Sequence, residues 1–290
     1  MTRARGFAFP LVLATAGISP IYGQASTPGA ALEFEVATVR QNKSTPDQPR
    51  FPGDGQGTLL RGGQLTMRNQ VLKTLLGFAF NPGNQRFRDD LVVRAPSWVD
   101  SDRFDVVAKA PPDLPARECF FSGYCYPDKR LAAMLRTLLE QEFHIVYHQE
   151  QRPTNVYALV AGKGGPKLRR PAAPGDRLCK RIAGDTADPD AKGLLSIEAG
   201  FICTNMSMAD FADLLPEMAP AYIDRVVLNS TGLEGTYDFK LVWVGAALLD
   251  QGGLNVFEAM EKQIGLKLEA RKAPITVTVI DHIDKLAGDN

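Results

Sequence analysis

Three histidines, His144, His148 and His282, are the side chains of this chain best suited to metal binding or to acid–base chemistry near neutral pH. His144 and His148 lie four residues apart in a segment with a strand pattern. Residues i and i+4 of a strand share a face but lie about 13 Å apart, so one metal ion could not bind both. No HExxH sequence is present. We therefore expect ordinary strand histidines on the more polar face, and no metal site.

Three closely spaced aspartates, Asp100, Asp102 and Asp105, form the pattern D-x-D-x-x-D before a predicted strand. Neighbouring carboxylates could hold calcium, but the glycine of a helical calcium loop is missing. We interpret the pattern as a polar turn that enters the strand. Two glycine-rich stretches, 53–57 and 162–167, lack the strand–loop–helix context or the Ser or Thr of a phosphate-binding loop. The sequence thus predicts neither a metal nor a cofactor.

Nucleophilic catalysis has no sequence signature in this chain. There is no G-x-S-x-G elbow, and no serine has neighbours that would mark it for acyl transfer. The cysteines are expected to form disulfides rather than a free thiol, so no catalytic residue is assigned. Two carboxylates that are distant in sequence could still meet in a cleft, which leaves glycoside hydrolysis open.

The first 25 residues and the four cysteines both indicate export. Residues 1–25 have a basic start, an apolar run of about a dozen residues and small residues before Ser26, the pattern of a cleaved secretory signal peptide. An even number of cysteines in an exported chain favours two disulfides, and the pairs nearest in sequence are Cys119–Cys125 and Cys179–Cys203. The spacings C-x5-C and C-x23-C fit no zinc-knuckle pattern. We expect a secreted or periplasmic protein.

The composition argues against two classes of partner. The full chain has 33 basic and 33 acidic residues, so it has no long-range field that would attract nucleic acid or anionic lipid. No apolar stretch after the signal segment is long enough to span a bilayer. The expected partner is therefore an unknown envelope protein or a small ligand, with no nucleic acid and no membrane span after signal cleavage.

An internal repeat is the strongest pattern in the sequence. Residues 135–161 align with residues 256–282 without a gap, which places Pro153 on Pro274. Two further pairs of segments lie upstream, 64–80 with 200–216 and 103–110 with 236–243, and they place Asn69 on Asn205 and Asp105 on Asp238. The sequence therefore predicts two halves that share one duplicated unit.

Each half is predicted to follow the order strand–helix–strand–helix–strand–strand. Apolar residues recur at helical spacing in the helices and alternate with polar residues in the strands. The last two strands of each half are expected to turn near Pro153 or Pro274, since proline cannot donate to a central ladder. Short links favour antiparallel pairing. We expect an α+β fold of two tandem repeated halves, each an antiparallel sheet with two helices packed on one face.

These patterns divide the chain into four parts: a signal peptide (1–25), a first repeat with an N-terminal strand (34–168), a linker (170–193) and a second repeat (195–286). The halves differ most at residues 110–130, where the first carries the Cys119–Cys125 pair and four aromatic residues, Phe120, Phe121, Tyr124 and Tyr126. Such a stapled aromatic loop could form a partner-binding surface. Alternatively, it folds onto its own domain and covers apolar surface there.

Six segments spread over residues 34–286 carry a family resemblance: FEVATVRQN, RGGQLTMRNQVLKTLLGFAF, APSWVDSDRFDVVAKA, LRTLLEQEFHIVYHQEQRPTNVYALVAGKGGPKL, LNSTGLEGTYDFKLVW and QIGLKLEARKAPITVTVIDHIDKL. Together they resemble an uncharacterised secreted family that is expanded in soil acidobacteria of the Solibacter type. That family has no established activity, so the resemblance implies no catalytic or ligand residue. Some relatives are joined to membrane metallopeptidase sensors of the antibiotic-response type. LTMRNQVLKTLL also resembles part of the short α+β interaction domain of secretins and TonB-dependent receptors.

The residues and the resemblance together favour a secreted or periplasmic protein that binds or senses a partner and is not an enzyme. The alternative is an extracytoplasmic hydrolase of cell-wall or polysaccharide material that uses paired carboxylates between the halves. A third possibility is a structural component of the envelope without a small ligand.

Overall fold

The computed structural model describes residues 32–43, 58–61, 63–81, 88–111, 129–175, 177–184, 187 and 189–286. Several sequence predictions lie outside these residues: the signal peptide, the Cys119–Cys125 pair, and the aromatic residues Phe120, Phe121, Tyr124 and Tyr126. Within the described part of the chain, sheets and helices are mixed, which confirms the α+β class.

Four antiparallel strands form the first sheet. In the order β1-β5-β3-β2, they are β1 (Val36–Gln41), β5 (Arg103–Lys109), β3 (Gln64–Val71) and β2 (Thr58–Arg61). Alternate side chains of β3 and β5 are buried, as expected for a sheet with one covered face. The helices that cover it are α1 (Leu72–Phe80) and α3 (Lys129–Glu142), and the short α2 (Arg88–Leu91) follows α1. We call this sheet with its helices the first lobe.

The second sheet has three antiparallel strands. In the order β10-β8-β7, they are β10 (Thr236–Val244), β8 (Glu198–Ser207) and β7 (Leu178–Ala183). The helices on its covered face are α4 (Met208–Met218) and α5 (Val256–Ala259), which continues as a π-helical stretch (Met260–Ile264). The hydroxyl of Ser207 accepts a hydrogen bond from the Asp210 N–H at 3.1 Å and caps the start of α4. This sheet with its helices is the second lobe.

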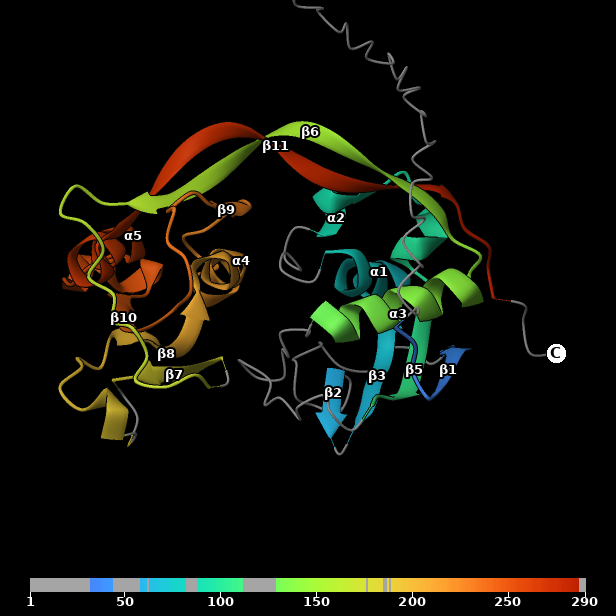
Figure 1. The fold of residues 1–290 in the computed structure, drawn as a ribbon, viewed down its shortest axis with the longest axis horizontal. Helices are drawn as coiled ribbons and strands as arrows, with labels where there is room; N and C mark the ends of the chain where they lie inside the picture. Colours follow the sequence, from blue (N-terminus) through green and yellow to red (C-terminus); the bar gives the residue numbers. More distant parts are fainter. Residues whose placement is uncertain are drawn as a thin grey trace, which may run out of the picture. The chain divides into compact units, whose positions relative to one another are not determined.

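A long two-stranded ribbon contributes to both lobes (Figure 1). Its strands, β6 (Val146–Ala161) and β11 (Leu266–His282), pair antiparallel with Pro153 directly opposite Pro274. Two short strands add in parallel near the C-terminal ends of the long ones: β4 (Val92–Val93) beside β11, and β9 (Val227–Asn229) beside β6. The order in this sheet is β4-β11-β6-β9.

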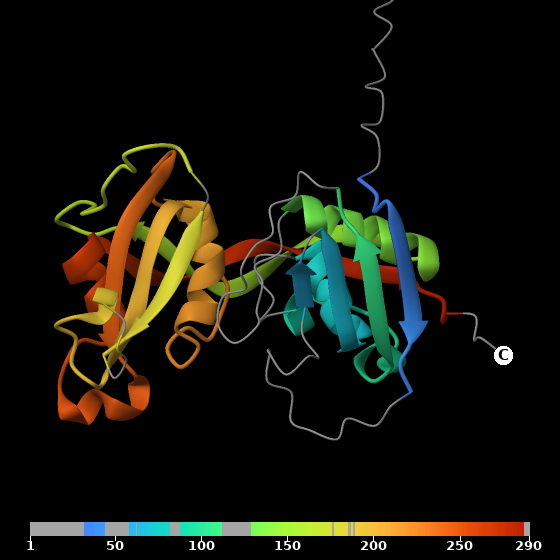
Figure 2. The same cartoon turned by 90° about the horizontal axis from the view of Figure 1, so that it is seen from below.

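The helices of each lobe lie between its sheet and the ribbon (Figures 1 and 2). In the first lobe, Ile280 of β11 is buried in the core and Tyr147 of β6 packs against it. In the second lobe, Leu159 of β6 and Leu266 of β11 are buried in the core. Each long strand therefore supplies apolar side chains to both cores.

The prediction that each half ends in two strands joined by a turn near its proline was wrong. β6 and β11 are continuous through Pro153 and Pro274, and they pair with each other. The Tyr157 N–H donates to the carbonyl of Val226 beside β6, so odd-numbered residues of β6 direct their backbone groups away from β11. Pro153 therefore turns its missing donor away from the ladder, at a point that β9 does not reach. Proline is tolerated there because no hydrogen bond of the ribbon is lost.

The predicted disulfide Cys179–Cys203 is confirmed. The two cysteines lie opposite each other on β7 and β8, with Cα atoms 4.0 Å apart, and both are buried. The bond therefore ties the edge strand of the second sheet to its central strand. No described helix has both the length and the apolar character that a membrane crossing requires.

Candidate functional site

The three histidines gather at one end of the ribbon. His148 lies in β6 and His282 is the last residue of β11. His144 was predicted to share a strand with His148, but it lies in a turn between α3 and β6, with a left-handed backbone (φ 46°). The carboxylate of Asp284 lies 3.3 Å from Nδ1 of His144 and 3.0 Å from Nε2 of His282. Among the described residues, no three His, Cys, Asp or Glu side chains are placed to hold a metal ion.

The three aspartates of the D-x-D-x-x-D pattern face different partners. Asp100 lies 2.8 Å from Lys73 Nζ, Asp102 lies 2.9 Å from Lys285 Nζ, and Asp105 accepts hydrogen bonds from Asn69 N (2.7 Å) and Asn42 Nδ2 (2.9 Å). The first two carboxylates hold the turn before β5 in place, and the third is part of the strand itself.

The contact between Asp105 and Asn69 recurs in the second lobe. There Asn205 N donates to Asp238 Oδ1 at 2.8 Å. Both asparagines have a left-handed backbone, with φ values of 51° and 50°, beside shifts in strand register. Asparagine is one of the few residues that tolerates this conformation. The repeat alignment paired each residue with its counterpart in the other half, but it did not predict the contact within each half.

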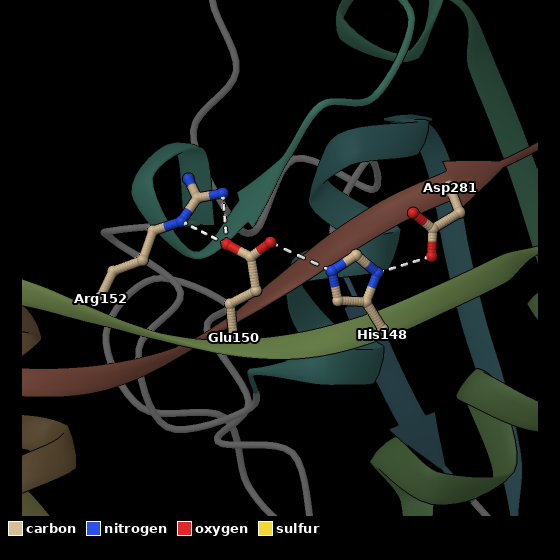
Figure 3. Close-up of polar contacts among 4 residues, drawn as sticks. All are labelled: His148, Glu150, Arg152 and Asp281. Carbon is tan, nitrogen blue, oxygen red and sulfur yellow. Dashed lines mark hydrogen bonds and ion pairs between the residues drawn. The ribbon is translucent and has the colours of Figure 1, made fainter.

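Four charged side chains form a chain of contacts on the ribbon (Figure 3). His148, Glu150 and Arg152 are alternate residues of β6, so they share a face. His148 Nδ1 lies 2.6 Å from Asp281 Oδ2, and His148 Nε2 lies 3.1 Å from Glu150 Oε1. Arg152 donates from Nε (3.0 Å) and Nη2 (2.8 Å) to Glu150 Oε2. Sequence reasoning missed this cluster, since Asp281 lies 133 residues from His148.

The carboxylates on either side favour the charged form of His148. The hydrogen bond to Asp281, followed by that to Glu150, raises the pKa of His148 above its ordinary value of 6.5. Arg152, followed by His148, lowers the pKa of Glu150 below its ordinary value of 4.5. Both ring nitrogens of His148 are occupied, so the ring offers no free base to a substrate. The cluster is best described as an electrostatic tie between β6 and β11.

The cluster predicts a pH range in which it stabilises the fold. A histidine whose pKa is raised on folding stabilises the folded state fully below its unfolded pKa, near 6.5, and this contribution is lost as the pH rises through the folded pKa. A glutamate whose pKa is lowered contributes fully above 4.5, and this is lost as the pH falls through its folded pKa. We expect the melting-temperature difference between the parent and His148→Gln to be largest between these two values.

An NMR titration of the His148 ring protons measures the same effect directly. The pKa of His148 should lie above 6.5 in the parent. Asp281→Asn should lower it towards 6.5, because the main cause of the shift is then lost. A parent His148 that titrates at or below its ordinary value would contradict the geometry of the cluster.

The outer face of the second sheet is the face directed away from its helices. Residues between β7 and β8 cover part of this face. Leu194, in the segment that links β7 to β8, packs against the buried side chains of Ile182 and Val242. In the same segment, Asp190 lies 2.7 Å from Lys180 Nζ through its carboxylate, and its carbonyl accepts a hydrogen bond from Lys240 Nζ at 3.1 Å. Leu194 and Asp190 therefore cover part of this face.

Among the residues that the structure describes, no helix or strand covers the corresponding face of the first sheet (Figure 2). Val36 on β1 is 65% exposed and Val107 on β5 is 37% exposed. Arg40 and Arg68 are exposed, and neither guanidinium has a hydrogen bond or ion pair with any described residue. We call the outward side chains Val36, Thr38, Arg40, Arg68 and Val107 the open face. Sequence reasoning did not single it out, because strand alternation shows two faces but not which of them stays uncovered.

Comparison with known proteins gives one match. A family model described as a protein of unknown function (DUF3738) matches residues 73–283. The match begins in α1 and ends just after β11, so it includes both sets of helices and the whole ribbon, whereas β1, β2 and β3 precede it. No match was found among curated proteins or among solved structures.

Proposed function

The chain belongs to this DUF3738 family of unknown function, and we propose that it is a secreted or periplasmic protein that binds or senses a partner through its open face without doing chemistry. The observation that carries the proposal is the difference between the two outer sheet faces. In the second lobe Leu194 and Asp190 cover part of that face, whereas in the first lobe the described residues leave two valines and two arginines in solvent. Val36 and Val107 are diagonal neighbours on adjacent strands, and grouped exposed apolar side chains with a polar rim are typical of contact surfaces.

The open face also indicates the chemistry of the partner. Lys109 is already paired with Glu35, and Asp105 is engaged by Asn69, so the charge left unpaired on this face is positive. Arg68 therefore favours an acidic group, and Val107 offers an apolar contact close to the sheet centre. We infer an envelope protein with an acidic, partly apolar patch.

A duplicated unit accounts for the likeness between the lobes. Each lobe has a left-handed asparagine held by an aspartate on the neighbouring strand. Each second helix is followed by a left-handed residue, His144 or Gly265, before the long strand begins. Each short parallel strand, β4 or β9, pairs with the long strand of the other half. The two prolines that the repeat aligns lie opposite each other, which supports a duplication whose halves have exchanged their last strands.

The cysteine chemistry supports an extracytoplasmic location. A disulfide persists in oxidising compartments, and Cys179–Cys203 is buried within a sheet, where it stabilises the folded chain. The predicted signal peptide, the proposed kinship with secreted proteins of soil acidobacteria, and the resemblance to the interaction domain of secretins and TonB-dependent receptors agree with a contact function outside the cytoplasm.

Two substitutions on the open face test the proposal. Arg68→Glu with Val107→Glu should weaken partner binding about tenfold or more, because a buried contact and a charge pair are lost together. Both side chains point away from the core, so the fold should persist. The partner would be captured from an envelope extract with the parent protein and identified by mass spectrometry. Its affinity for the parent and for the variant would then be measured by surface plasmon resonance.

The matched control is Lys163→Glu with Leu249→Glu. It reverses one exposed charge and replaces one leucine that is 37% exposed, the same exposed fraction as Val107. Equal affinities of the two double variants for the partner would contradict the proposal. If the parent turned over a cell-wall or polysaccharide substrate, and lost this activity on substitution of a carboxylate, the hydrolase alternative would be favoured.

A further inference from the structure

At several strand edges of this protein, the outward backbone groups are hydrogen-bonded by other residues of the chain or are absent because the residue is proline. On β10, the backbone N–H and C=O of Val242 both bind the side-chain amide of Gln263, at 2.9 Å and 2.7 Å. Asp238 on the same edge exchanges two backbone hydrogen bonds with Arg169. At the ribbon centre, Pro153 and Pro274 present no donor. These features prevent association, because the free N–H and C=O groups of an unpaired edge can bind a strand of another chain.

β1 is an edge strand to which no described residue binds in a comparable way. The Asn42 N–H donates to the Arg103 carbonyl, so the even-numbered residues of β1 pair with β5. The backbone groups of Ala37, Val39 and Gln41 therefore point away from the sheet, and no described residue binds them. β1 has six residues, contains no proline, and carries one charge, that of Arg40.

We propose that β1 pairs antiparallel with β1 of a second copy of this chain, so that the first sheets of two copies form one continuous sheet. With Thr38 on the two-fold axis, the outward groups of Ala37 face those of Val39 in the second copy. Arg40 then faces Val36 of the second copy and lies beside Glu35, the acidic residue that precedes it. Glu35 already binds Lys109 of its own copy, so Arg40 of the second copy would approach a carboxylate that it shares with Lys109.

The repulsion between the two Arg40 side chains distinguishes two of the possible registers. With Thr38 on the axis, the two Arg40 side chains lie about 13 Å apart along the strands, at about 3.3 Å per residue. With Val39 on the axis, they would come within about 7 Å along the strands, which is unfavourable for like charges. Charge therefore favours the register centred on Thr38 over the one centred on Val39. This association engages Val36, Thr38 and Arg40 of the open face, but Arg68 and Val107, the residues substituted to test partner binding, lie on inner strands and stay exposed.

Ala37→Pro tests the pairing through the oligomeric state. Proline removes one outward donor from each copy, and it should leave the pairing with β5 intact because the Ala37 N–H points away from β5. Analytical ultracentrifugation should show a concentration-dependent dimer of the parent, with a dissociation constant about tenfold or more higher in Ala37→Pro. A parent that stays monomeric at its highest soluble concentration would overturn the proposal, and so would an unchanged dissociation constant.

A cysteine on the axis tests the register and does not require the proline variant to fold. Two Thr38→Cys side chains would form a non-hydrogen-bonded pair with Cα atoms about 4.5 Å apart, within the range of a disulfide. Mild oxidation should give a covalent dimer on a non-reducing gel. Thr66→Cys, on the same sheet face but in the inner strand β3, is the matched control and should remain monomeric, as should the oxidised parent. Equal cross-linking of the two cysteine variants would overturn the proposed register.

Discussion

Replacing Gly265 by alanine is expected to lower the free energy of unfolding by about 3–5 kcal/mol, the sum of backbone strain and overpacking. Gly265 ends the helical segment after α5 with a backbone φ of 67°, a region that favours glycine. A Cβ atom there would lie 2.1 Å from the carbonyl oxygen of Gly165 and 2.9 Å from the backbone nitrogen of Lys167. Both are backbone atoms, so neither can rotate away.

The clash would disrupt the contact between the end of this helical segment and the residues that follow β6. Gly162 N donates to the Gly265 carbonyl, and Lys167 N donates to the Ile264 carbonyl. Chemical denaturation measures the loss of stability. Gly164→Ala is the control, because its Cβ would meet nothing within 4 Å and should change stability by less than about 0.5 kcal/mol. An equal loss in the two variants would show that the close approach at Gly265 is absent.

The position that the repeat aligns with Gly265 is held by His144, and there the sequence prediction failed. His144 also has a left-handed backbone, but its side chain is 74% exposed. A side chain at this position therefore costs backbone strain energy but causes no steric clash. The alternation of polar and apolar residues from His144 to His148 was interpreted as one strand. The signal that could have corrected this was the aligned glycine, since glycine after a helix commonly marks a left-handed end.

Sequence periodicity predicted the helices and the faces of the strands, because burial imposes a period of 3.6 or 2 on each segment separately. It did not predict which strands pair, because pairing depends on segments that are distant in the chain. The proline signal was ambiguous for the same reason. A proline fits a turn, and it also fits a strand position whose backbone N–H would point away from the neighbouring strand. The continuous pairing of β6 with β11 decides for the second, and no described strand lies beside Pro153 or Pro274.

The candidate sites also differ in whether local sequence is enough to predict them. Four cysteines allow three connectivities, and the choice of the pair nearest in sequence gave the Cys179–Cys203 bond that the structure contains. The spacing of His148, Glu150 and Arg152 places them on one strand face, but nothing local predicts that Asp281 completes the cluster. The open face is harder still to predict, because local sequence does not say whether a distant segment covers a sheet face, as Leu194 does in the second lobe.

Leu159→Ala is expected to destabilise the second lobe by about 2–5 kcal/mol, although Leu159 belongs to the strand that follows α3 of the first lobe. Its side chain is 0% exposed in the second core, where Phe211 and Leu241 are also buried. Truncation removes apolar contacts and leaves a cavity. Native-state hydrogen exchange should therefore accelerate more at the amides of β8 and β10 than at those of β3 and β5.

Ile280→Ala is the mirror experiment. Ile280 belongs to β11, which follows the helical segment of the second lobe, yet it is buried in the first core together with Leu139. Its truncation should accelerate exchange mainly at β3 and β5. If each substitution instead acted mainly on the lobe that precedes it in the chain, the long strands would not cross, and the register that places Pro153 opposite Pro274 would be wrong. Crossed strands mean that neither half completes its core alone, so both lobes depend on one ribbon.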